Sequence, residues 1–549
     1  MPIAPSLPEP PEKVWPYRSI AFLLILGTAL LRLAYLLHDC PLDLAPDEAH
    51  YWHWSQRLDW SYYSKGPLVA LLIRASCWFF GPWSEHVTGN QMAAVRLPAI
   101  VCGALLLISI YVLTALLLRM EKWALIVVGL ALTMPIIAAG SLLMTIDAPY
   151  TCCWGWALVF VYRALFRESK RSWLWAGVCV AVGVLAKYTM VLFVPMVGFF
   201  LLATPAMRGQ LRRRGFWLMV LTGALGGVPI LIWNMQNDWM TLRHTLGSHV
   251  GIQADNPSIR WLGPLAYLAM QCGLFLVYWF IVWALAMVSH RPGREKRPEY
   301  RFLWFMSVPM FVFFMLFSLK NGGGEPNWPI TAYLSGMVLA CAWLLEQFHS
   351  PNTWLRRTTW IMVPTMALVG LLLTVLVHEP RLVLPLLARL VRAPTKENPM
   401  PLRQVDATCR LRGFREALAP DIDQVRGQLR AEGIEPILAG ANWNLPGEVS
   451  FYCQGHPVVY SLGGGIGERH SQYDLWRPDP IAEPAPFKGQ TFIVVGARPD
   501  LLRGAFERVG PSHEVVFRDA GQPLCSWTVT VCRGYRGFAS DIVKNRDKY

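Results

Sequence analysis

The run SIAFLLILGTALLRLAYLLH (19–38) is the first long apolar segment of the chain, and PDEAHYWHWSQRLDWSYYSKGPL (46–68) follows it closely. The first segment is long enough to cross a bilayer as a helix. Asp47 and Glu48 then stand where that helix has just ended, among Trp, Tyr and His side chains. Because a carboxylate beside the hydrocarbon region is costly, its presence there indicates chemistry or ion handling.

The composition sets the class of the protein. The chain has 549 residues, of which 54% are hydrophobic and 16% charged, and its mean hydropathy is +0.34. Soluble domains of this length are more polar, so we expect a polytopic α-helical membrane protein embedded in a lipid bilayer. The net charge is +14, but Lys and Arg gather between the apolar segments, as the positive-inside rule predicts. Nucleic acid is therefore not an expected partner.

The apolar segments predict about eleven transmembrane helices. They lie near residues 19–38, 94–118, 123–141, 148–166, 173–186, 190–205, 216–233, 261–289, 302–319, 329–347 and 358–377. The basic segments RALFRESKR (163–171) and RGQLRRR (208–214) are both expected on the cytoplasmic side. The chain between them must then cross out and return, which puts Lys187 and Tyr188 at an outer turn. The same rule predicts a cytoplasmic N-terminus and a C-terminus outside.

The composition also predicts the domain boundaries. We expect a disordered cytoplasmic tail over 1–18, a transmembrane catalytic domain over 19–378 whose outer loop 39–93 carries the acidic motif, and a soluble α/β domain over 379–549. The first apolar run lacks a convincing cleavage site, so we interpret it as an uncleaved signal anchor. The length of the 261–289 segment leaves open whether that helix is broken or tilted.

The outer domain shows strand and helix patterns. QTFIVVG, HEVVFRDA and CSWTVTVCRGY predict strands, and DIDQVRGQLRAEG predicts an amphipathic helix. SLGGGIGER (461–469) lacks the spacing of a dinucleotide-binding loop, and we interpret it as a turn. A disulfide within this domain is one of two open alternatives, and its candidate cysteines are Cys409, Cys453, Cys525 and Cys532.

Polar residues from separate segments share the predicted outer side. They are Asp47, Glu48, His50, His53, Lys65, Asp147, Lys187, the loop KNGGGEPNWP (320–329) and the 234–260 segment. Each has a structural alternative: Asp147 could cap a helix, Lys187 could lie in a solvated turn, and the glycines before Glu325 could form a hinge. No CxxC or HExxH motif is present in the sequence.

The residue types favour a reaction in which a phosphate leaves a sugar. A helix over 47–57 would place Asp47, His50 and Tyr51 on one face, with Trp54 one turn further on. A carboxylate flanked by aromatic rings suits a general base beside a sugar ring. A departing phosphate needs cations rather than a second acid. Lys65 and Lys187 are the predicted phosphate-binding cations, and a divalent ion held by Glu48, His50 or Asp147 is an open alternative.

The motifs together resemble a known family. PDEAHYWHWSQRLDWSYYSKGPLVALLIR, MTIDAP, GVLAKYT, EPNWP and SQYDLW (471–476) resemble the bacterial family 39 glycosyltransferases, which are similar to protein O-mannosyltransferases and lipid A aminoarabinose transferases. The resemblance covers about residues 19–378 and implies the GT-C fold. It also implies a catalytic aspartate at Asp47, with Glu48 beside it, and a second catalytic acid at Asp147. Lys65 matches a family position that approaches the lipid phosphate, although Ser64 and Gly66 replace the commoner neighbours.

The resemblance implies an inverting glycosyltransferase of the bacterial inner membrane. Its donor would be a polyprenyl-phosphate-linked sugar, and its acceptor a lipid, glycan or protein of the cell envelope. The remaining candidates for substrate binding are His50, Tyr51, Tyr63, Tyr188, Glu325, Asn327 and Trp328. SQYDLW is expected to cover the site from the outer domain.

Two other classes of function remain as alternatives. A transporter or flippase of lipid-linked sugars would ordinarily show internal repeats and binding groups near the bilayer midplane, whereas the ionisable residues here gather at one face. A receptor or scaffold would depend on the outer domain alone, and loss of the acidic motif would then be harmless.

Overall fold

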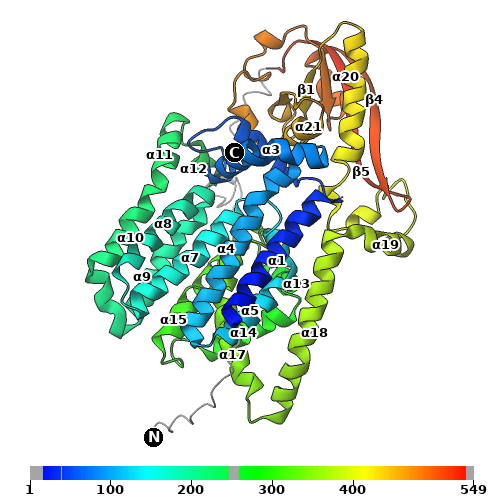
Figure 1. Ribbon diagram of the computed structural model, residues 1–549. Coiled ribbons are helices and arrows are strands. Elements are labelled where there is room, and N and C mark those ends of the chain that lie inside the picture. The colour runs from blue at the N-terminus through cyan, green and yellow to red at the C-terminus, as the bar shows by residue number, and fades with distance from the viewer. Residues whose placement is uncertain (1–15, 39, 246–258, 540–549) are drawn as a thin grey trace, which may run out of the picture.

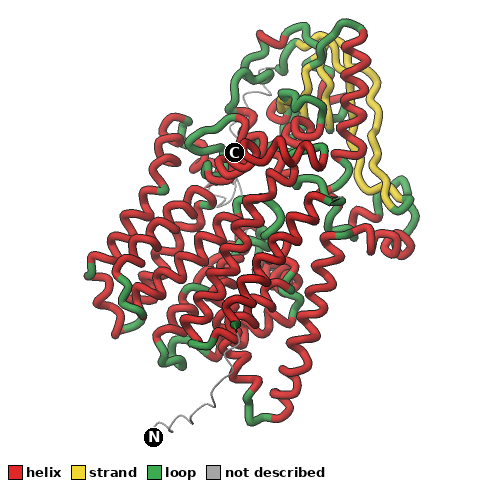
Figure 2. Tube along the Cα trace, viewed as in Figure 1, coloured by secondary structure: helices red, strands yellow, loops and turns green. Residues whose placement is uncertain are grey.

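A computed structural model describes residues 16–38, 40–245 and 259–539, and in it a helical bundle carries a sheet domain at one end (Figure 1). The strands all gather in that end domain (Figure 2). The bundle helices are α1 (Tyr17–Leu37), α4 (Met92–Leu118), α5 (Glu121–Leu132), α6 (Pro135–Gly140), α7 (Asp147–Phe166), α8 (Lys170–Ala186), α9 (Phe193–Ala203), α10 (Arg214–Leu225), α11 (Gly227–Gln236), α13 (Gly263–Leu274), α14 (Tyr278–Ser289), α15 (Pro298–Phe305), α16 (Val308–Asn321), α17 (Ile330–Phe348) and α18 (Thr353–His378).

Each predicted apolar segment contains helix, but not all are single long helices. Within the described ranges, six helices are long and apolar enough to cross a membrane, and a seventh span results if α13 and α14 count as one. That pair is bent by 113°, so the 261–289 segment is broken rather than merely tilted. The segment 123–141 is also divided, because Pro135 lacks the N–H that would continue α5 and instead begins α6. The number of eleven spans stays a prediction.

Residues 40–93 are largely helical, where the sequence analysis expected an outer loop over 39–93. They contain α2 (Pro46–Gln56) and α3 (Leu68–Thr88), and the short α12 (Met240–His244) lies at the same end of the bundle (Figure 1). On α3, Trp78 is 70% exposed and Phe79 67% exposed. Exposed aromatic side chains of this kind suit a helix that lies in the membrane interface.

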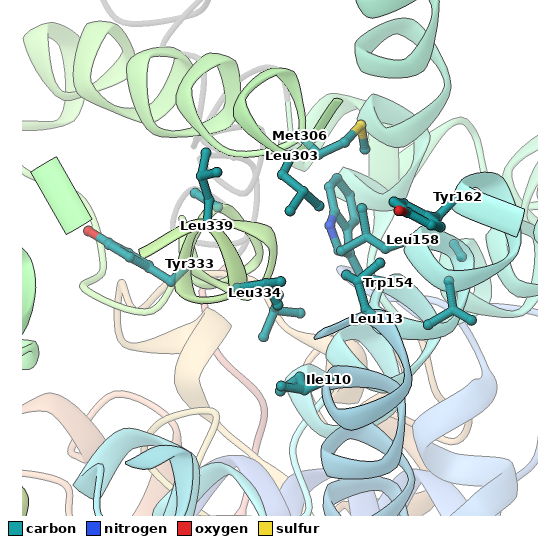
Figure 3. Packing of buried hydrophobic residues seen from close by; sticks show 14 of the residues in the cluster. Ile110, Leu113, Trp154, Leu158, Tyr162, Leu303, Met306, Tyr333, Leu334 and Leu339 are labelled. Atoms are coloured by element: carbon teal, nitrogen blue, oxygen red, sulfur yellow. The ribbon is translucent and has the colours of Figure 1, made fainter. Parts of the chain in front are cut away.

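The centre of the bundle is a packed apolar core. Trp154 and Leu158 of α7 lie between side chains of α4, α15 and α17 (Figure 3). Trp154 is completely buried. Because side chains from helices far apart in sequence interlock here, the core positions α7 in the bundle, and the first residue of α7 is a predicted site residue, Asp147.

The end domain is a five-stranded mixed sheet with the strand order β2-β1-β3-β5-β4. Its elements are β1 (Ile437–Gly440), β2 (Val459–Ser461), β3 (Phe492–Val495), β4 (Phe506–Asp519), β5 (Gln522–Tyr535), α19 (Leu384–Leu390), α20 (Ala419–Ala431), α21 (Leu445–Tyr452) and α22 (Pro499–Leu502). β1 pairs in parallel with β2 and β3, while β5 is antiparallel to β3 and β4. The three strands and the helix expected from the sequence are present, and β1, β2 and α21 were not expected.

The cysteines of the end domain form no disulfide, although one was an open alternative. Cys409, Cys453, Cys525 and Cys532 are all free thiols. The Cys525 thiol instead donates to the carbonyl of Cys409 over 3.0 Å. The glycine-rich segment after β2 is a tight 3-10 turn at Gly463–Gly465 with no following helix, as its interpretation as a turn requires.

The end domain rests directly on α2. Phe451 of α21 meets the Trp52 ring edge-on, with 5.0 Å between ring centroids. A Cβ atom at Gly447 would lie 2.8 Å from the backbone of Ala49, so the two helices touch where α21 has no side chain. The hydroxyl of Tyr452 accepts the N–H of Leu44 over 2.6 Å. α2 is therefore held between the bundle and the end domain.

Candidate functional site

The start of α2 separates the two acidic residues. Pro46 occupies the first turn, and the Glu48 carboxylate accepts the N–H of Ala45 over 2.8 Å. Glu48 therefore points back into the protein, as the third residue of a capping box does. Asp47 leaves the same turn in another direction and keeps an exposed side chain.

The carboxylate of Glu48 is buried and accepts hydrogen bonds from the protein itself. Arg96 of α4 donates to it from Nε over 3.1 Å and from Nη2 over 2.8 Å, and both side chains have no exposed surface. The N–H of Met144 also donates to Glu48 over 2.7 Å. The structure thus contradicts Glu48 as a catalytic or metal-binding residue, because its oxygens are buried and already accept hydrogen bonds.

Asp147 joins three separate segments. It is the first residue of α7 and makes no side-chain cap. Its Oδ1 lies 2.7 Å from Nζ of Lys187, and its Oδ2 accepts from Nδ2 of Asn327 over 2.6 Å. Lys187 lies at the break between α8 and the 3-10 helix that follows, where the sequence placed a turn. The helix-cap alternative for Asp147 is therefore wrong, and Asp147, Lys187 and Asn327 form one polar cluster.

Lys65 reaches the same region through a tight turn. A Cβ at Gly66 would collide with the carbonyl of Leu185, so the turn fits against the end of α8 only because residue 66 is glycine. The ammonium group of Lys65 makes no hydrogen bond or ion pair with any residue that the structure describes. Burial lowers its pKa, and so does the positive charge of Lys187, while Asp47 and Asp147 act in the opposite direction.

Asp47 lies in a recess that water can still reach. Partial dehydration raises the pKa of its carboxyl, and the charge of Asp147 adds to this. Three cations oppose the shift, namely Lys65 and, from the end domain, Arg469 and Arg410. A carboxylate with a raised pKa surrounded by cations can accept a proton and stay close to an anion.

Aromatic rings of α2 form one wall of the site. The His50 ring lies 4.8 Å from Trp54, and Tyr51 lies 5.0 Å from the same ring, as expected for a helix over this stretch. The hydroxyl of Tyr473, in SQYDLW, contacts Nδ1 of His50 at 3.2 Å and Nδ1 of His53 at 3.1 Å. Burial lowers the pKa of His53 to about 3 and that of His50 well below its usual value, so both rings are neutral.

The predicted metal site is not assembled. Among the described residues, no group of three or more His, Cys, Asp and Glu side chains is placed to hold a metal ion. Glu48 pairs with Arg96, and His50 turns toward Tyr473. The residues therefore do not fit a divalent ion shared by Glu48, His50 and Asp147.

The other predicted binding residues divide into two groups. The Tyr188 hydroxyl lies 3.3 Å from that of Ser61, beside the Lys65 turn. The Tyr63 ring meets the His244 ring at a tilt, with 4.6 Å between the ring centroids. His244 belongs to the described part of the 234–260 segment, whereas 246–258 lie outside the described residues. Glu325 is exposed and lacks a polar side-chain partner among the described residues, and Trp328 packs at 5.8 Å on Phe314 of the bundle.

A cavity of about 180 Å³ opens beside Asp147. Its polar end is formed by Thr145, Asp147, Thr151 and Asn327, and apolar side chains of α4, α6 and α17 line the rest. Such a cavity can hold an apolar chain whose polar head lies at the Asp147 cluster.

Four contributors to the site were missed by the sequence analysis. Arg96, Trp443 and Arg410 lie outside the motifs, and Arg469 ends the glycine-rich segment that the sequence analysis interpreted only as a turn. For Arg410 and Arg469, one signal was the abundance of arginine in the outer domain.

Known proteins match both the sequence and the fold. Residues 64–233 match the family described as dolichyl-phosphate-mannose-protein mannosyltransferase. The lipid A galacturonosyltransferase RgtD of Rhizobium johnstonii is 30% identical over 331 residues, which cover 59% of this chain and 65% of that protein. The match thus spans slightly less than two thirds of the relative's length.

Two solved structures of ArnT from Cupriavidus metallidurans share the architecture. The one bound to undecaprenyl phosphate has a TM-score of 0.61 at 16% identity and covers 93% of this chain and 97% of its own. The apo structure has a TM-score of 0.54 at 15% identity and covers 93% and 98%. These likenesses confirm the expected fold. The chain is therefore a multi-pass membrane protein of the GT-C fold, related in sequence to the protein mannosyltransferases and to a lipid A galacturonosyltransferase.

Proposed function

We propose that the chain is an integral membrane glycosyltransferase that takes a sugar from a polyprenyl-phosphate donor. The observation that carries this proposal is the contrast at the start of α2. Glu48 forms a buried ion pair with Arg96, while Asp47 stays accessible beside Lys65 and the Asp147 cluster. An accessible base next to cations is the arrangement that transfer from a phosphate requires.

The relatives suggest the substrates. The curated relative is named as a lipid A galacturonosyltransferase, and one ArnT structure is bound to undecaprenyl phosphate. By analogy we propose a polyprenyl-phosphate-linked galacturonosyl donor and an acceptor glycolipid of the lipid A type. The cavity beside Asp147 would hold part of an apolar chain.

The proposed step is a single displacement. Asp47 accepts the proton of the acceptor hydroxyl, and the hydroxyl oxygen forms a bond to the anomeric carbon of the sugar. The bond from that carbon to the phosphate oxygen breaks, and the polyprenyl phosphate leaves with the electron pair. Because the nucleophile enters opposite the leaving group, the anomeric configuration inverts.

The cations would stabilise the departing phosphate. Lys65 has no hydrogen-bond partner among the described residues, so its ammonium group is free to bind an oxyanion. Lys187 is held by Asp147 over 2.7 Å, and Asp147 in turn by Asn327 over 2.6 Å. In this proposal Asp147 and Asn327 position Lys187 and do not react.

The aromatic residues would shape the sugar pocket. His50 and Tyr51 lie on the α2 face nearest Asp47, and Tyr63 and Tyr188 flank the Lys65 turn. Glu325 is exposed and Trp328 packs on Phe314 of the bundle, so we retain both only as neighbours of Asn327.

The location of the site follows from the topology. We propose a bacterial inner-membrane protein with a cytoplasmic N-terminus and with the 379–549 domain in the periplasm. The charge distribution between the spans supports this orientation. It places Asp47, Lys65 and Asp147 on the periplasmic face, where lipid-linked rather than nucleotide-linked donors are available.

Replacement of Asp47 tests the assignment of the base. Asp47→Asn keeps the size and the exposure of the side chain but cannot accept the proton, so transfer should fall at least about 100-fold. The measurement is the formation of labelled glycolipid by purified protein in vesicles that contain the donor and the acceptor.

The matched control is Asp500→Asn, which removes an exposed carboxylate paired only with Arg498 in the end domain. It should leave transfer unchanged. Normal transfer by Asp47→Asn would refute Asp47 as the base. Labelled sugar that crosses the bilayer without appearing in a new product would favour the flippase alternative over an enzyme.

A further inference from the structure

The end domain places an arginine at the site. Arg469 follows the glycine-rich turn after β2, and its guanidinium lies 4.6 Å from the centroid of the Trp443 ring. Trp443 meets His50 of α2 edge-on, with 5.5 Å between the ring centroids. The contacts therefore run from Arg469 through Trp443 to the helix that carries Asp47.

The charge of Arg469 acts on the catalytic face of α2. It influences the titration of Asp47, His50, Tyr51 and Lys65 alike. No other residue of the end domain acts on so many of the described groups of the site. An arginine on a remote surface would not show this pattern.

Arg469 is free to bind a ligand. Its side chain is exposed, and it makes no hydrogen bond or ion pair within the part of the chain that the structure describes. The cation–π contact with Trp443 restrains the guanidinium group, and a restrained guanidinium can present two parallel N–H groups to an oxyanion. The neighbouring His470 and Asp474 contact each other at 4.0 Å and leave the arginine unengaged.

The site contains more positive charge than one phosphate needs. Lys65 and Lys187 lie at the donor phosphate in the proposed function. Arg469 and Arg410 add two further cations from the end domain, and both act on Asp47. Against these four cations stand the carboxylates of Asp47 and Asp147 and the single negative charge of the donor phosphodiester, which leaves one positive charge. A second anionic group in the substrates would account for it, since recessed like charges repel unless an anion lies between them.

We propose that Arg469, held by Trp443, is a subsite for an oxyanion carried on a sugar ring, and so makes the end domain a specificity element of the transferase. This inference rests on the proposed function and deepens it. The anion has two chemical sources: the carboxylate of a uronosyl donor, or a phosphate on the acceptor glycolipid. Both offer oxygen pairs that fit a guanidinium.

The test compares substrates with and without the anion. Arg469→Gln, Arg469→Lys and wild-type protein are assayed with polyprenyl-phosphate galacturonosyl and galactosyl donors, and with lipid A acceptors that carry or lack their phosphates. Loss of a charge-assisted hydrogen bond should lower kcat/KM by about 10- to 100-fold. Arg469→Lys should recover part of the lost kcat/KM, because lysine keeps the positive charge but lacks the paired N–H groups of a guanidinium.

The substrate pairs distinguish the two possible anions, the donor carboxylate and the acceptor phosphate. A loss confined to the galacturonosyl donor, with KM for the donor raised, assigns the uronate. A loss confined to the phosphorylated acceptor assigns the acceptor phosphate. Equal losses on every pair of substrates, or no loss on any, would overturn the proposal. Arg503→Gln, which removes an exposed arginine elsewhere in the end domain, is the matched control and should leave every rate unchanged.

A pH profile gives an independent readout. Because the Arg469 charge lowers the pKa of Asp47, Arg469→Gln should move the acid limb of kcat/KM to higher pH, even with a neutral donor. If the acid limb of kcat/KM lies at the same pH in Arg469→Gln as in the wild type, Arg469 lies outside the site. Every comparison uses the transfer rate of the wild-type protein as its reference. If the wild-type protein transfers no sugar, the result counts against the proposed function rather than against this subsite.

Discussion

Asp47 and Glu48 stand side by side at the start of α2, but consecutive side chains leave a helix about 100° apart. One direction leads to Arg96 and the inside of the protein, and the other leads to the recess beside Lys65. The acidic pair is thus one structural carboxylate and one accessible carboxylate. A buried ion pair with complete hydrogen bonding holds the helix, and the free neighbour is available for chemistry.

Glu48→Gln should destabilise the protein, whereas Asp47→Asn should not. Without the Glu48 charge, Arg96 stays buried and unpaired, which costs about 3–5 kcal/mol. The measurement is thermal unfolding of both variants in the same detergent. A Glu48→Gln variant that unfolds at the wild-type temperature and yet has no transfer activity would contradict this assignment, because Glu48 would then act in the reaction.

At the scale of elements, the site depends on where helices begin and break. α7 begins at Asp147, α8 ends at Ala186 just before Lys187, and α17 begins at Ile330, three residues after Asn327. Helix ends leave backbone groups and side chains free that the helix interior would hide. The turn at Lys65 joins this group only because Gly66 permits contact with the end of α8 at Leu185.

Gly66→Ala should displace the Lys65 turn. The added methyl group meets the Leu185 carbonyl, so the turn must move away from α8 and carry the ammonium group with it. We expect KM for the lipid-phosphate donor to rise by about 10-fold, with a smaller change in kcat. Donor titrations of transfer rate provide the measurement.

Gly129→Ala in α5 is the control for the Gly66 variant. A Cβ atom at that position would have no atom within 4 Å, so KM should not rise and the unfolding temperature should not fall. An unchanged KM in Gly66→Ala would show that the contact with Leu185 does not position Lys65.

At the scale of the whole molecule, α21, the helix of the end domain that packs on α2, carries a buried carboxyl group. Glu448 of α21 is fully buried, and neither of its oxygens has a hydrogen-bond partner in the described structure. Burial raises its pKa well above the usual value, and the negative charges of Asp43 and Glu48 add to this. Glu448 therefore keeps its proton to a higher pH than an exposed glutamate does.

The stability of the protein should fall as the pH rises, because of Glu448. Its pKa is higher in the folded than in the unfolded state, so the folded state binds more protons. The associated stability is complete below the unfolded pKa of about 4.5 and is lost as the pH rises through the folded pKa. The slope is at most about 1.4 kcal/mol per pH unit.

Glu448→Gln removes this titration and should flatten the decline of the unfolding temperature above about pH 4.5. Glu432→Gln, which removes an exposed carboxylate paired with Arg533, should keep the wild-type slope. Parallel profiles for wild type and Glu448→Gln would show that Glu448 does not titrate in the folded protein.

The sequence predicted much of the fold because hydropathy and charge act locally. The apolar runs marked the positions of the bundle helices, and alternating patterns marked β3, β4 and β5. The breaks inside runs were harder to predict, because a bend such as the 113° turn between α13 and α14 depends on neighbouring helices. β1 and β2 are short and buried, and short apolar runs do not distinguish strand from helix.

By itself, the sequence determined the membrane class, the resemblance to GT-C enzymes and the position of Asp47 in an acidic motif, because these follow from composition and from residues close together in the chain. Only the tertiary structure decided that Glu48 pairs with Arg96, that Asp147 holds Lys187 and Asn327, and that Arg469 reaches the site. The physical reason is distance along the chain: these contacts join residues that only packing brings together, and no local pattern records them.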